Sequence, residues 1–189
     1  MAMPMARRYT IADLADCPED GQKFELIRGE LIVSPAPSVR HQIIVTRLAH
    51  LLAGYLEPLG LLDTFFAVAA DICWDDESLV QPDLLVTRPE DISGAWTTVK
   101  RLRLAVEVIS PSSRRRDRLD KRTLYQEHDV ETYWTVDAEA QMVERWHPAD
   151  ARPELISDRL LWRVHPEAPE MTIDLAHLFA NLPIGHDDS

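Results

Sequence analysis

Two acidic residues stand inside otherwise apolar stretches of the chain, where strands are expected. LVQPDLLV (residues 79–86) contains Asp83, and LAVEVI (residues 104–109) contains Glu107. A buried carboxylate needs a salt bridge, a proton or a cation, because burying it without a partner is costly. If the two strands are neighbours, the carboxylates converge and repel one another. Mg²⁺ commonly binds one or two carboxylates together with waters and phosphate oxygens, so the pair predicts a metal site, although a salt bridge would explain either acid alone.

A dense cluster of positive charge follows the Glu107 stretch. Residues 114–122, RRRDRLDKR, carry six basic and two acidic side chains, a local charge of +4 in a chain of net charge −12. Helical spacing puts Lys121 on the same face as Leu124 and Tyr125. From there its ammonium group can reach over the end of the Glu107 strand, to orient a metal-bound water or stabilise charge on a phosphate. The alternatives are a lysine extending from the edge of the core and, for the arginines, a solvated helix face or a salt bridge to Glu107.

The composition is that of one globular domain. Hydrophobic residues make up 46% of 189, and no apolar run approaches the ~20 residues that span a bilayer. The start of the chain lacks the apolar segment of a secretory signal, and Cys17 and Cys73 lack metal-site spacing, so we expect a cytoplasmic protein. We predict a single domain over residues 1–189, with residues 1–9 and 183–189 as flexible tails. The net charge of −12 disfavours a nucleic-acid binder without excluding one, because screening over ~8 Å leaves a local basic patch effective.

The expected elements alternate between helices and strands. The sequence predicts a short helix over residues 11–17, a hairpin around Arg28 and Gly29, and a long amphipathic helix within residues 39–60. Further on it predicts strands at residues 61–74, 79–89 and 101–110, a helix at about residues 116–128, a hairpin around residues 139–140, and a tail with two weaker strands and a short helix over residues 172–179. This order predicts an α/β fold with a mixed central sheet flanked by helices.

In combination, these segments resemble a known group of nucleases. The stretches QPDLLV, VEVISPSS and DRLDKRTLYQEHDVETYWTVD resemble the PD-(D/E)xK nucleases. With FELIRGELIVSPAPSVRHQ and DLAHLF, they are similar to a large bacterial subfamily of endonuclease-like proteins known as a domain of unknown function. The resemblance covers roughly residues 10–180 and implies the restriction-endonuclease-like fold.

The resemblance implies roles for individual residues. Asp83 and Glu107 match the two acids that bind a divalent metal, Mg²⁺ or Mn²⁺, and Glu30 matches an upstream acid that often completes the metal site. The lysine position of the E-x-K element is occupied by Ile109. Lys121 is therefore expected as a migrated lysine, delivered from the following helix, that helps to activate the attacking water.

Other residues are weaker candidates. His41 matches the SPxPxxxH stretch of the subfamily and could touch a phosphate or a water, or be a surface histidine at a helix start. Asp117 is expected behind the metal ligands, and Tyr125 there or at the substrate. The arginines of the basic segment are expected to hold the DNA backbone: Arg114, Arg115, Arg116 and Arg118.

The favoured hypothesis is a metal-dependent endonuclease that hydrolyses phosphodiester bonds of DNA. One alternative is a catalytically silent fold serving as a binding or oligomerisation module, which the net charge and Ile109 favour. Another is hydrolysis of a smaller phosphate ester, because one basic segment is a small footprint for duplex DNA. The resemblance also makes a homodimer an expectation, since many enzymes of this fold pair to cut both strands.

Overall fold

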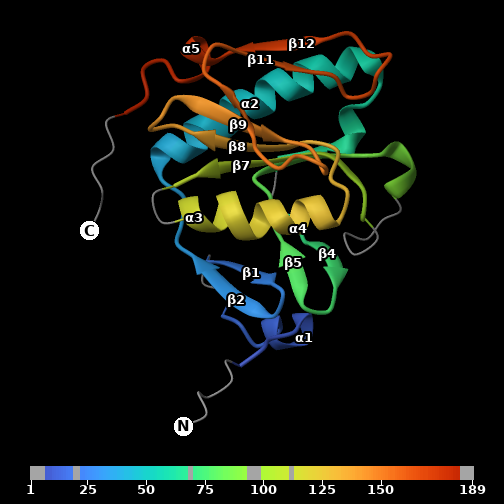
Figure 1. The fold of residues 1–189 in the computed structure, drawn as a ribbon, viewed down its shortest axis with the longest axis vertical. Coiled ribbons are helices and arrows are strands. Elements are labelled where there is room, and N and C mark those ends of the chain that lie inside the picture. Colours follow the sequence, from blue (N-terminus) through green and yellow to red (C-terminus); the bar gives the residue numbers. More distant parts are fainter. Residues whose placement is uncertain (1–6, 19–21, 68–69, 93–98, 111–112, 184–189) are drawn as a thin grey trace.

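The molecule is a mixed α/β structure in which a large sheet lies between helices and a smaller sheet adjoins it (Figure 1). The structure is a computed structural model that describes residues 7–18, 22–67, 70–92, 99–110 and 113–183. Parts of both predicted tails, residues 1–6 and 184–189, lie outside these ranges. The mixed sheet with flanking helices confirms the predicted α/β class.

The larger sheet has six strands in the order β10-β9-β8-β7-β6-β3. Its members are β3 (Phe65–Phe66), β6 (Leu84–Thr87), β7 (Leu102–Ile109), β8 (Tyr133–Asp137), β9 (Met142–Trp146) and β10 (Glu154–Ile156). Strands β7 and β8 run parallel, and the other neighbouring pairs are antiparallel. The strand that carries Glu107 therefore has a partner on each side and lies inside the sheet.

The smaller sheet has four strands in the order β2-β1-β5-β4. They are β1 (Lys23–Ile27), β2 (Glu30–Ser34), β4 (Ile72–Asp75) and β5 (Ser78–Val80). The β1–β2 hairpin turns through Arg28 (φ 52°) and Gly29 (φ 79°), both left-handed. A two-residue turn with positive φ at both positions matches the twist of the flanking strands, and this confirms the hairpin predicted at Arg28 and Gly29.

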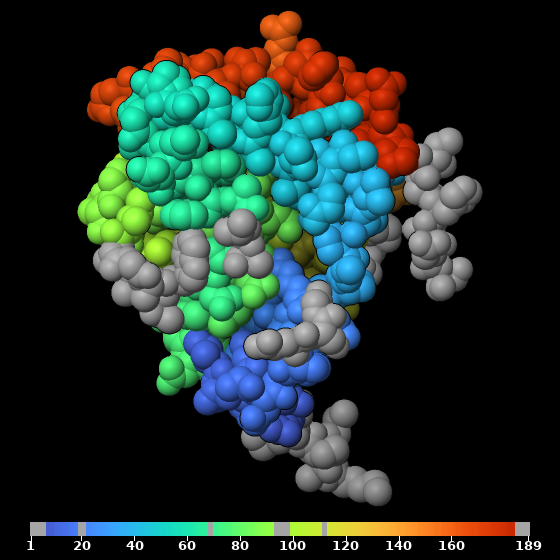
Figure 2. Space-filling model, turned by 180° about the vertical axis from the view of Figure 1, so that it is seen from behind, coloured from blue at the N-terminus to red at the C-terminus, as the bar shows by residue number. Residues whose placement is uncertain are grey.

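One face of the larger sheet is covered by the long helix α2 (Val39–Leu56) and by C-terminal elements. Helix α2 buries Ile44, Leu48, Leu52 and Leu56, the stripe that its helical period predicts. Next to it lie a two-stranded sheet and a short helix: β11 (Arg159–Trp162), β12 (Met171–Asp174) and α5 (Leu175–Leu178). From behind, Figure 2 shows α2 below the C-terminal segment and the blue N-terminal residues at the lower end.

The opposite face is covered by the helix that follows β7. It consists of α3 (Arg114–Arg116), a π-helical segment (Asp117–Lys121) and α4 (Arg122–Glu127), and it crosses in front of the sheet in Figure 1. Leu124 and Tyr125 pack into the apolar cluster on this side. The two helices therefore bury different side chains of the same strands, because successive residues of a strand point to opposite faces.

Two predicted strands are each interrupted. The stretch 79–89 divides into β5 and β6, which belong to different sheets, and the chain passes between the sheets at Gln81 and Pro82. Proline lacks the N–H that continues a ladder, so strand pairing ends there. The stretch 61–74 likewise divides into a 3₁₀ turn (Leu62–Thr64), β3 and β4. Apolar residues on both sides of each division hid it in the sequence, because burial on both faces removes the alternation that marks strand ends.

The ends of the described chain add smaller elements. Helix α1 (Ile11–Leu14) is shorter than predicted, the tail holds three strands instead of two, and residues 172–174 of the predicted last helix are strand β12. Two further 3₁₀ turns span Glu57–Leu59 and Pro89–Asp91. Within the described ranges, no helix is long and apolar enough to cross a bilayer.

Candidate active site

Asp83 and Glu107 come together on the face of the sheet that the α3–α4 helix covers. In the antiparallel β6–β7 ladder, Leu84 is opposite Val106. Both belong to the cluster under α2, so the adjoining Asp83 and Glu107 point to the other face. Asp83 Oδ2 also accepts a hydrogen bond from the backbone N–H of Val108 at 2.8 Å. The expectation that two neighbouring strands each contribute one acid to the same place is confirmed.

Lys121 reaches Glu107 from the helix. Its Nζ donates a hydrogen bond to Glu107 Oε1 at 2.8 Å, and it lies 3.6 Å from Asp117 Oδ1. Both ends of this contact are buried, Lys121 at 2% and Glu107 at 3% exposure. Lys121 and Asp117 belong to the π-helical segment, a geometry often found at functional sites. The ammonium that Ile109 cannot supply from the strand is therefore supplied from the following helix.

A third buried acid, Glu25 in β1, completes the cluster, although it was not among the residues predicted for the site. Glu25 Oε1 lies 2.9 Å from Lys121 Nζ and accepts a hydrogen bond from the backbone N–H of Gln81 at 2.8 Å. Lys23, two residues earlier on the same strand face, lies 3.4 Å from Glu25 Oε1 and 4.0 Å from Glu107 Oε2. Glu25 stands between Phe24 and Leu26, the same pattern of an acid inside an apolar strand that singled out Asp83 and Glu107. That pattern was sufficient to find it.

Glu30, the predicted upstream metal ligand, lies elsewhere. It is the exposed first residue of β2, opposite Ile27 at the turn end of the hairpin, whereas Glu25 is opposite Ile32. Among the described contacts, Glu30 has none with Asp83 or Glu107. Glu25 and Glu30 lie on different strands of the hairpin, on either side of its turn. Of the two side chains, that of Glu25 is buried and that of Glu30 is exposed. Glu25 therefore takes the place in the cluster that the resemblance had given to Glu30.

The cluster contains more negative than positive charge. Four carboxyl groups, of Glu25, Asp83, Glu107 and Asp117, face the ammonium groups of Lys23 and Lys121. Burial, against the opposing effect of the two lysines and with smaller contributions from the charges of Asp83 and Asp117, raises the pKa of Glu107 to about 8. The carboxyl groups of the site therefore outnumber its ammonium groups, and a bound cation would relieve this imbalance of charge.

The neighbouring groups respond to this field in opposite directions. Burial raises the pKa of Asp117. Burial alone would raise the pKa of Glu25 too, but the ammonium groups of Lys121 and Lys23 leave it below its ordinary value. For Lys121, burial acts to lower the pKa, and the surrounding carboxylates raise it well above its ordinary value. Lys121 is therefore charged, and it lies between the carboxyl groups of Glu25 and Glu107.

His41 contacts Asp83 from the first turn of α2. His41 Nε2 and Asp83 Oδ2 are 3.0 Å apart, and each side chain is 16% exposed. Burial acts to raise the pKa of Asp83, but the His41 hydrogen bond, with smaller effects of Lys23 and Val108, leaves it lowered. Ser38 caps α2 by accepting a hydrogen bond from the backbone N–H of His41, which fixes the start of the helix from which the imidazole extends. His41 thus lies at the site and orients a carboxylate.

Tyr125 lies behind Glu107 and not at a surface where a substrate could touch it. Its hydroxyl donates a hydrogen bond to Glu107 Oε1 at 3.0 Å, and the residue is fully buried. Tyr133 donates to the backbone oxygen of Asp117 at 3.1 Å. The prediction that Tyr125 contacts the substrate is replaced by a supporting role, because no part of its ring is open to solvent.

The basic segment divides into structural and exposed arginines. Arg118 contacts Asp137 Oδ2 at 3.0 Å and Glu144 Oε1 at 2.7 Å, and Arg114 contacts Glu139 Oε2 at 2.6 Å. These two arginines form ion pairs with acids of β8, β9 and their turn, so they are less free to hold DNA than the sequence suggested. Arg115 is exposed and Arg116 is partly exposed, and neither has an ion-pair partner among the described residues. Within the described part of this segment, these two arginines are the ones most available to a phosphate backbone.

The donor set fits a divalent cation of the Mg²⁺ type. Within the described ranges no group of three or more acidic, histidine or cysteine side chains is arranged to hold a metal ion. Mg²⁺ does not require one, because it commonly takes one or two carboxylates and completes its shell with waters and phosphate oxygens. Asp83 and Glu107 provide two such carboxylates on adjacent strands, at a place where positive charge is lacking. Hard oxygen ligands of this kind suit Mg²⁺ or Mn²⁺ and not a soft metal.

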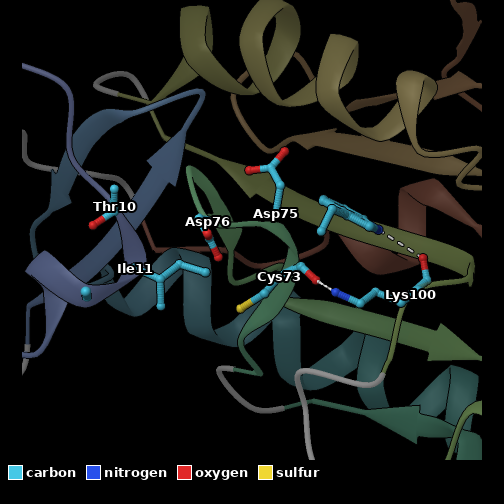
Figure 3. Close-up of a pocket in the computed structure, with 8 residues that line it drawn as sticks. Thr10, Ile11, Cys73, Asp75, Asp76 and Lys100 are labelled. Carbon is cyan, nitrogen blue, oxygen red and sulfur yellow. Dashed lines mark hydrogen bonds between the residues drawn. The ribbon is translucent and has the colours of Figure 1, made fainter.

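A hollow of about 620 Å³ lies away from these acids. It is lined by residues of α1, β4 and the loop before β7, including Ile11, Cys73, Trp74 and Lys100 (Figure 3). Trp74 Nε1 donates a hydrogen bond to the backbone oxygen of Lys100, and Lys100 Nζ donates to the backbone oxygen of Cys73. None of the residues of the acidic cluster lines this hollow, so it takes no part in the candidate active site.

Comparison with known proteins identifies the fold and the family. The curated proteins contain no match to the chain. Among solved structures, it is similar to a protein from Anabaena variabilis described as a "putative nuclease belonging to DUF820", with a TM-score of 0.73 and 20% sequence identity over 90% of this chain and 97% of that one. This likeness shows the fold, which is restriction-endonuclease-like. The model of the Uma2 family, described as "Putative restriction endonuclease", matches residues 11–176. That match covers most of the chain and includes every residue of the acidic cluster. The protein therefore belongs to the Uma2 family of restriction-endonuclease-like proteins.

Proposed function

We propose that the protein is a metal-dependent endonuclease that hydrolyses phosphodiester bonds of DNA. The observation that carries this proposal is the convergence of Asp83 and Glu107 from adjacent strands, with Lys121 donating to Glu107 from the next helix. Family membership supports the same activity. The absence of a lysine at Ile109 does not weaken it, because the ammonium group is present in the cluster by another route.

Asp83 and Glu107 are the residues that would hold the metal. A divalent cation at this place would supply Lewis-acid stabilisation of charge on the phosphate and lower the pKa of water. Lys121 and Tyr125 fix Glu107 Oε1, and His41 and the Val108 N–H fix Asp83 Oδ2. Each carboxylate retains a second oxygen that these hydrogen bonds leave available. We propose Mg²⁺ or Mn²⁺ as the ion.

In the hydrolysis, one water molecule is consumed and one ester bond of the phosphodiester is cleaved. A water oxygen forms a bond to phosphorus, the opposite ester P–O bond breaks, and one proton of the water ends on the departing alkoxide oxygen. The groups of this chain that can accept the water proton are the carboxylates of the cluster. Catalysis then depends mainly on positioning and on opposing the charge that develops on the phosphoryl oxygens.

DNA is the proposed substrate, and the positive groups available to it are few. Arg115 and Arg116 are the members of the basic segment without an internal partner among the described residues. Few phosphate contacts imply modest affinity with a shallow salt dependence and little reading of sequence. A homodimer, which would double this surface, and a cytoplasmic location remain predictions.

The proposal is tested by cleavage of supercoiled plasmid with Mg²⁺ or Mn²⁺. The wild-type protein should nick or linearise the plasmid, Asp83→Asn should lose this activity, and EDTA should abolish it. Glu30→Gln is the control, because it removes the charge of an exposed acid that lies outside the cluster. If the wild type fails to cut under any divalent metal, or if Asp83→Asn cuts as well as it does, the proposal is wrong.

A catalytically silent binding module is the second candidate. It is favoured by one observation, that Lys121 pairs with Glu25 and Glu107, so part of the buried negative charge is compensated within the chain itself. Calorimetry with Mn²⁺ separates the candidates. A nuclease site binds the ion through Asp83 and Glu107, and a purely structural ion-pair cluster shows no binding that these two residues control.

A further inference from the structure

The two lysines of the cluster have different surroundings. All three N–H groups of Lys121 face carboxylates: Glu107 at 2.8 Å, Glu25 at 2.9 Å and Asp117 at 3.6 Å. Its side chain is 3% exposed. An ammonium group has three donors: two of those of Lys121 make short contacts with carboxylates, and its burial closes the third, on the Asp117 side, to a water or a phosphate oxygen.

Lys23 is placed differently, at the first residue of β1. Its Nζ lies 3.4 Å from Glu25 and 4.0 Å from Glu107, both longer than a charge-assisted hydrogen bond of about 2.7–2.9 Å. Its side chain is 25% exposed. Within the described ranges these two long contacts are its ion pairs, so its donors can turn to a ligand without leaving a buried acid unpaired.

Exposure shows which groups of the cluster a ligand would meet. Lys23, His41 and Asp83 are partly open to solvent, whereas the side chains of Glu25, Glu107 and Lys121 are nearly closed. The partly open groups come from β1, from the start of α2 and from the residue before β6. A phosphate that approaches the metal-binding carboxylates from solvent therefore arrives beside Lys23.

We propose that Lys23 is the ammonium group that contacts the phosphate of the substrate, and that Lys121 is a positioning residue that holds Glu25 and Glu107. This inference rests on the proposed nuclease function. Lys23 donates a hydrogen bond to a non-bridging phosphoryl oxygen and opposes the negative charge that grows there in the transition state. No proton is transferred from Lys23 in this role. The phosphate contact that the sequence predicted for Lys121 passes to a lysine on a different element.

The test compares Lys23→Met with Arg159→Met. Each substitution removes one positive charge, and Arg159 is an exposed residue of β11, at the other end of the molecule from β1 (Figure 1). Single-turnover cleavage of a short duplex with Mg²⁺ should slow by about 100-fold or more in Lys23→Met, the usual effect of losing one transition-state donor. Arg159→Met should cut at the wild-type rate, and Lys23→Arg should recover part of the activity.

Two further measurements distinguish contact from positioning. Duplex affinity measured in Ca²⁺ over a range of salt should show a slope reduced by about 0.9 in Lys23→Met, the effect of one lost phosphate contact. The Mn²⁺ affinity of Lys23→Met, measured by calorimetry, and its thermal midpoint of unfolding should remain close to those of the wild type. A Lys23→Met protein that loses Mn²⁺ binding in proportion to activity would show that Lys23 acts through Glu25 and Glu107, which overturns the proposal.

The outcomes separate this inference from the function on which it rests. If the wild type cuts and Lys23→Met cuts equally with an unchanged salt slope, only the assignment of Lys23 is wrong. If the wild type binds the duplex in Ca²⁺ but does not cut it, the nuclease proposal fails and the salt slope alone decides the contact. If the wild type neither cuts nor binds, both proposals are wrong.

Discussion

Lys121 Nζ and Glu107 Oε1 are joined by a 2.8 Å hydrogen bond between two buried side chains, one from a helix and one from the strand before it. Glu107 cannot be buried unpaired at low cost, and the strand position two residues later holds Ile109. The chain returns a lysine to the same oxygen through a π-helical segment fourteen residues after Glu107. The same pair therefore stabilises the fold, by compensating a buried charge, and sets the electrostatics of the site.

The first prediction concerns the loss of that pair. Lys121→Met should lower the free energy of unfolding by about 3–5 kcal/mol at pH 8, because it leaves buried carboxylates uncompensated. The loss should shrink toward pH 5, where those carboxyls can take up protons in the folded protein. Urea unfolding at the two pH values measures it. Lys23→Met, partly exposed, is the control and should cost far less at both. An equal effect of the two substitutions would contradict the assignment of Lys121 as a structural cation.

The second prediction is a pH dependence of stability due to Glu107. In the folded, metal-free protein the pKa of Glu107 is raised to about 8 from an ordinary value of 4.5. The folded state then holds more protons than the unfolded state between these values, so this contribution to stability is full below about pH 4.5 and is lost as the pH rises through 8. Mn²⁺ should reverse the trend, because it binds the deprotonated carboxylate of the folded state.

Urea midpoints from pH 5 to 8.5, with and without Mn²⁺, measure this effect. Glu107→Gln should flatten the pH dependence and remove the response to Mn²⁺, whereas Glu30→Gln should retain both. Asp83 does not obscure the result. Its pKa is lowered, so its contribution is lost only as the pH falls below its ordinary value of 3.8. A wild-type stability that rises steadily from pH 5 to 8 would contradict the raised pKa of Glu107.

The third prediction separates the two acids of the first hairpin. Glu25→Gln should reduce plasmid cleavage strongly and destabilise the fold by about 1–3 kcal/mol, because it weakens the contacts with Lys121 and with the Gln81 N–H. Glu30→Gln should leave both properties near those of the wild type, since Glu30 is exposed. Both variants carry the same Glu→Gln change, so cleavage assays and urea unfolding compare the two positions directly. A stronger effect at Glu30 would restore the role that the resemblance first gave it.

The fourth prediction divides the basic segment. Arg118→Met should destabilise the fold by about 1.5–3 kcal/mol, because Asp137 and Glu144 lose their charged donor. It should leave the salt slope of DNA binding nearly unchanged. Arg115→Met should do the reverse, lowering the slope by about 0.9 with little change in stability. Fluorescence anisotropy over a range of salt and urea unfolding measure the two effects. If Arg118→Met alone changed the slope, the ion pairs would be incidental to its function.

The sequence determined which residue types carry the chemistry and much of the local structure. An acid inside an apolar strand is costly wherever the strand lies, so Asp83 and Glu107 were recognisable from their neighbours alone. The period of α2, the hairpin at Arg28 and Gly29, and the lysine on the apolar face of the helix after β7 also follow from local patterns, because they depend on residues a few positions apart.

Only the tertiary structure decided which charges pair. Glu25 and Glu30 differ by which side of a hairpin faces the α4 helix, and Arg115 and Arg118 differ by which side of one helix faces β8 and β9. Lys23 and Lys121 differ in how many carboxylates surround each ammonium group. The chain pattern cannot supply these answers, because burial and the distance between charges depend on contacts between residues far apart in sequence, and those two quantities determine whether a charge supports the fold or meets a ligand.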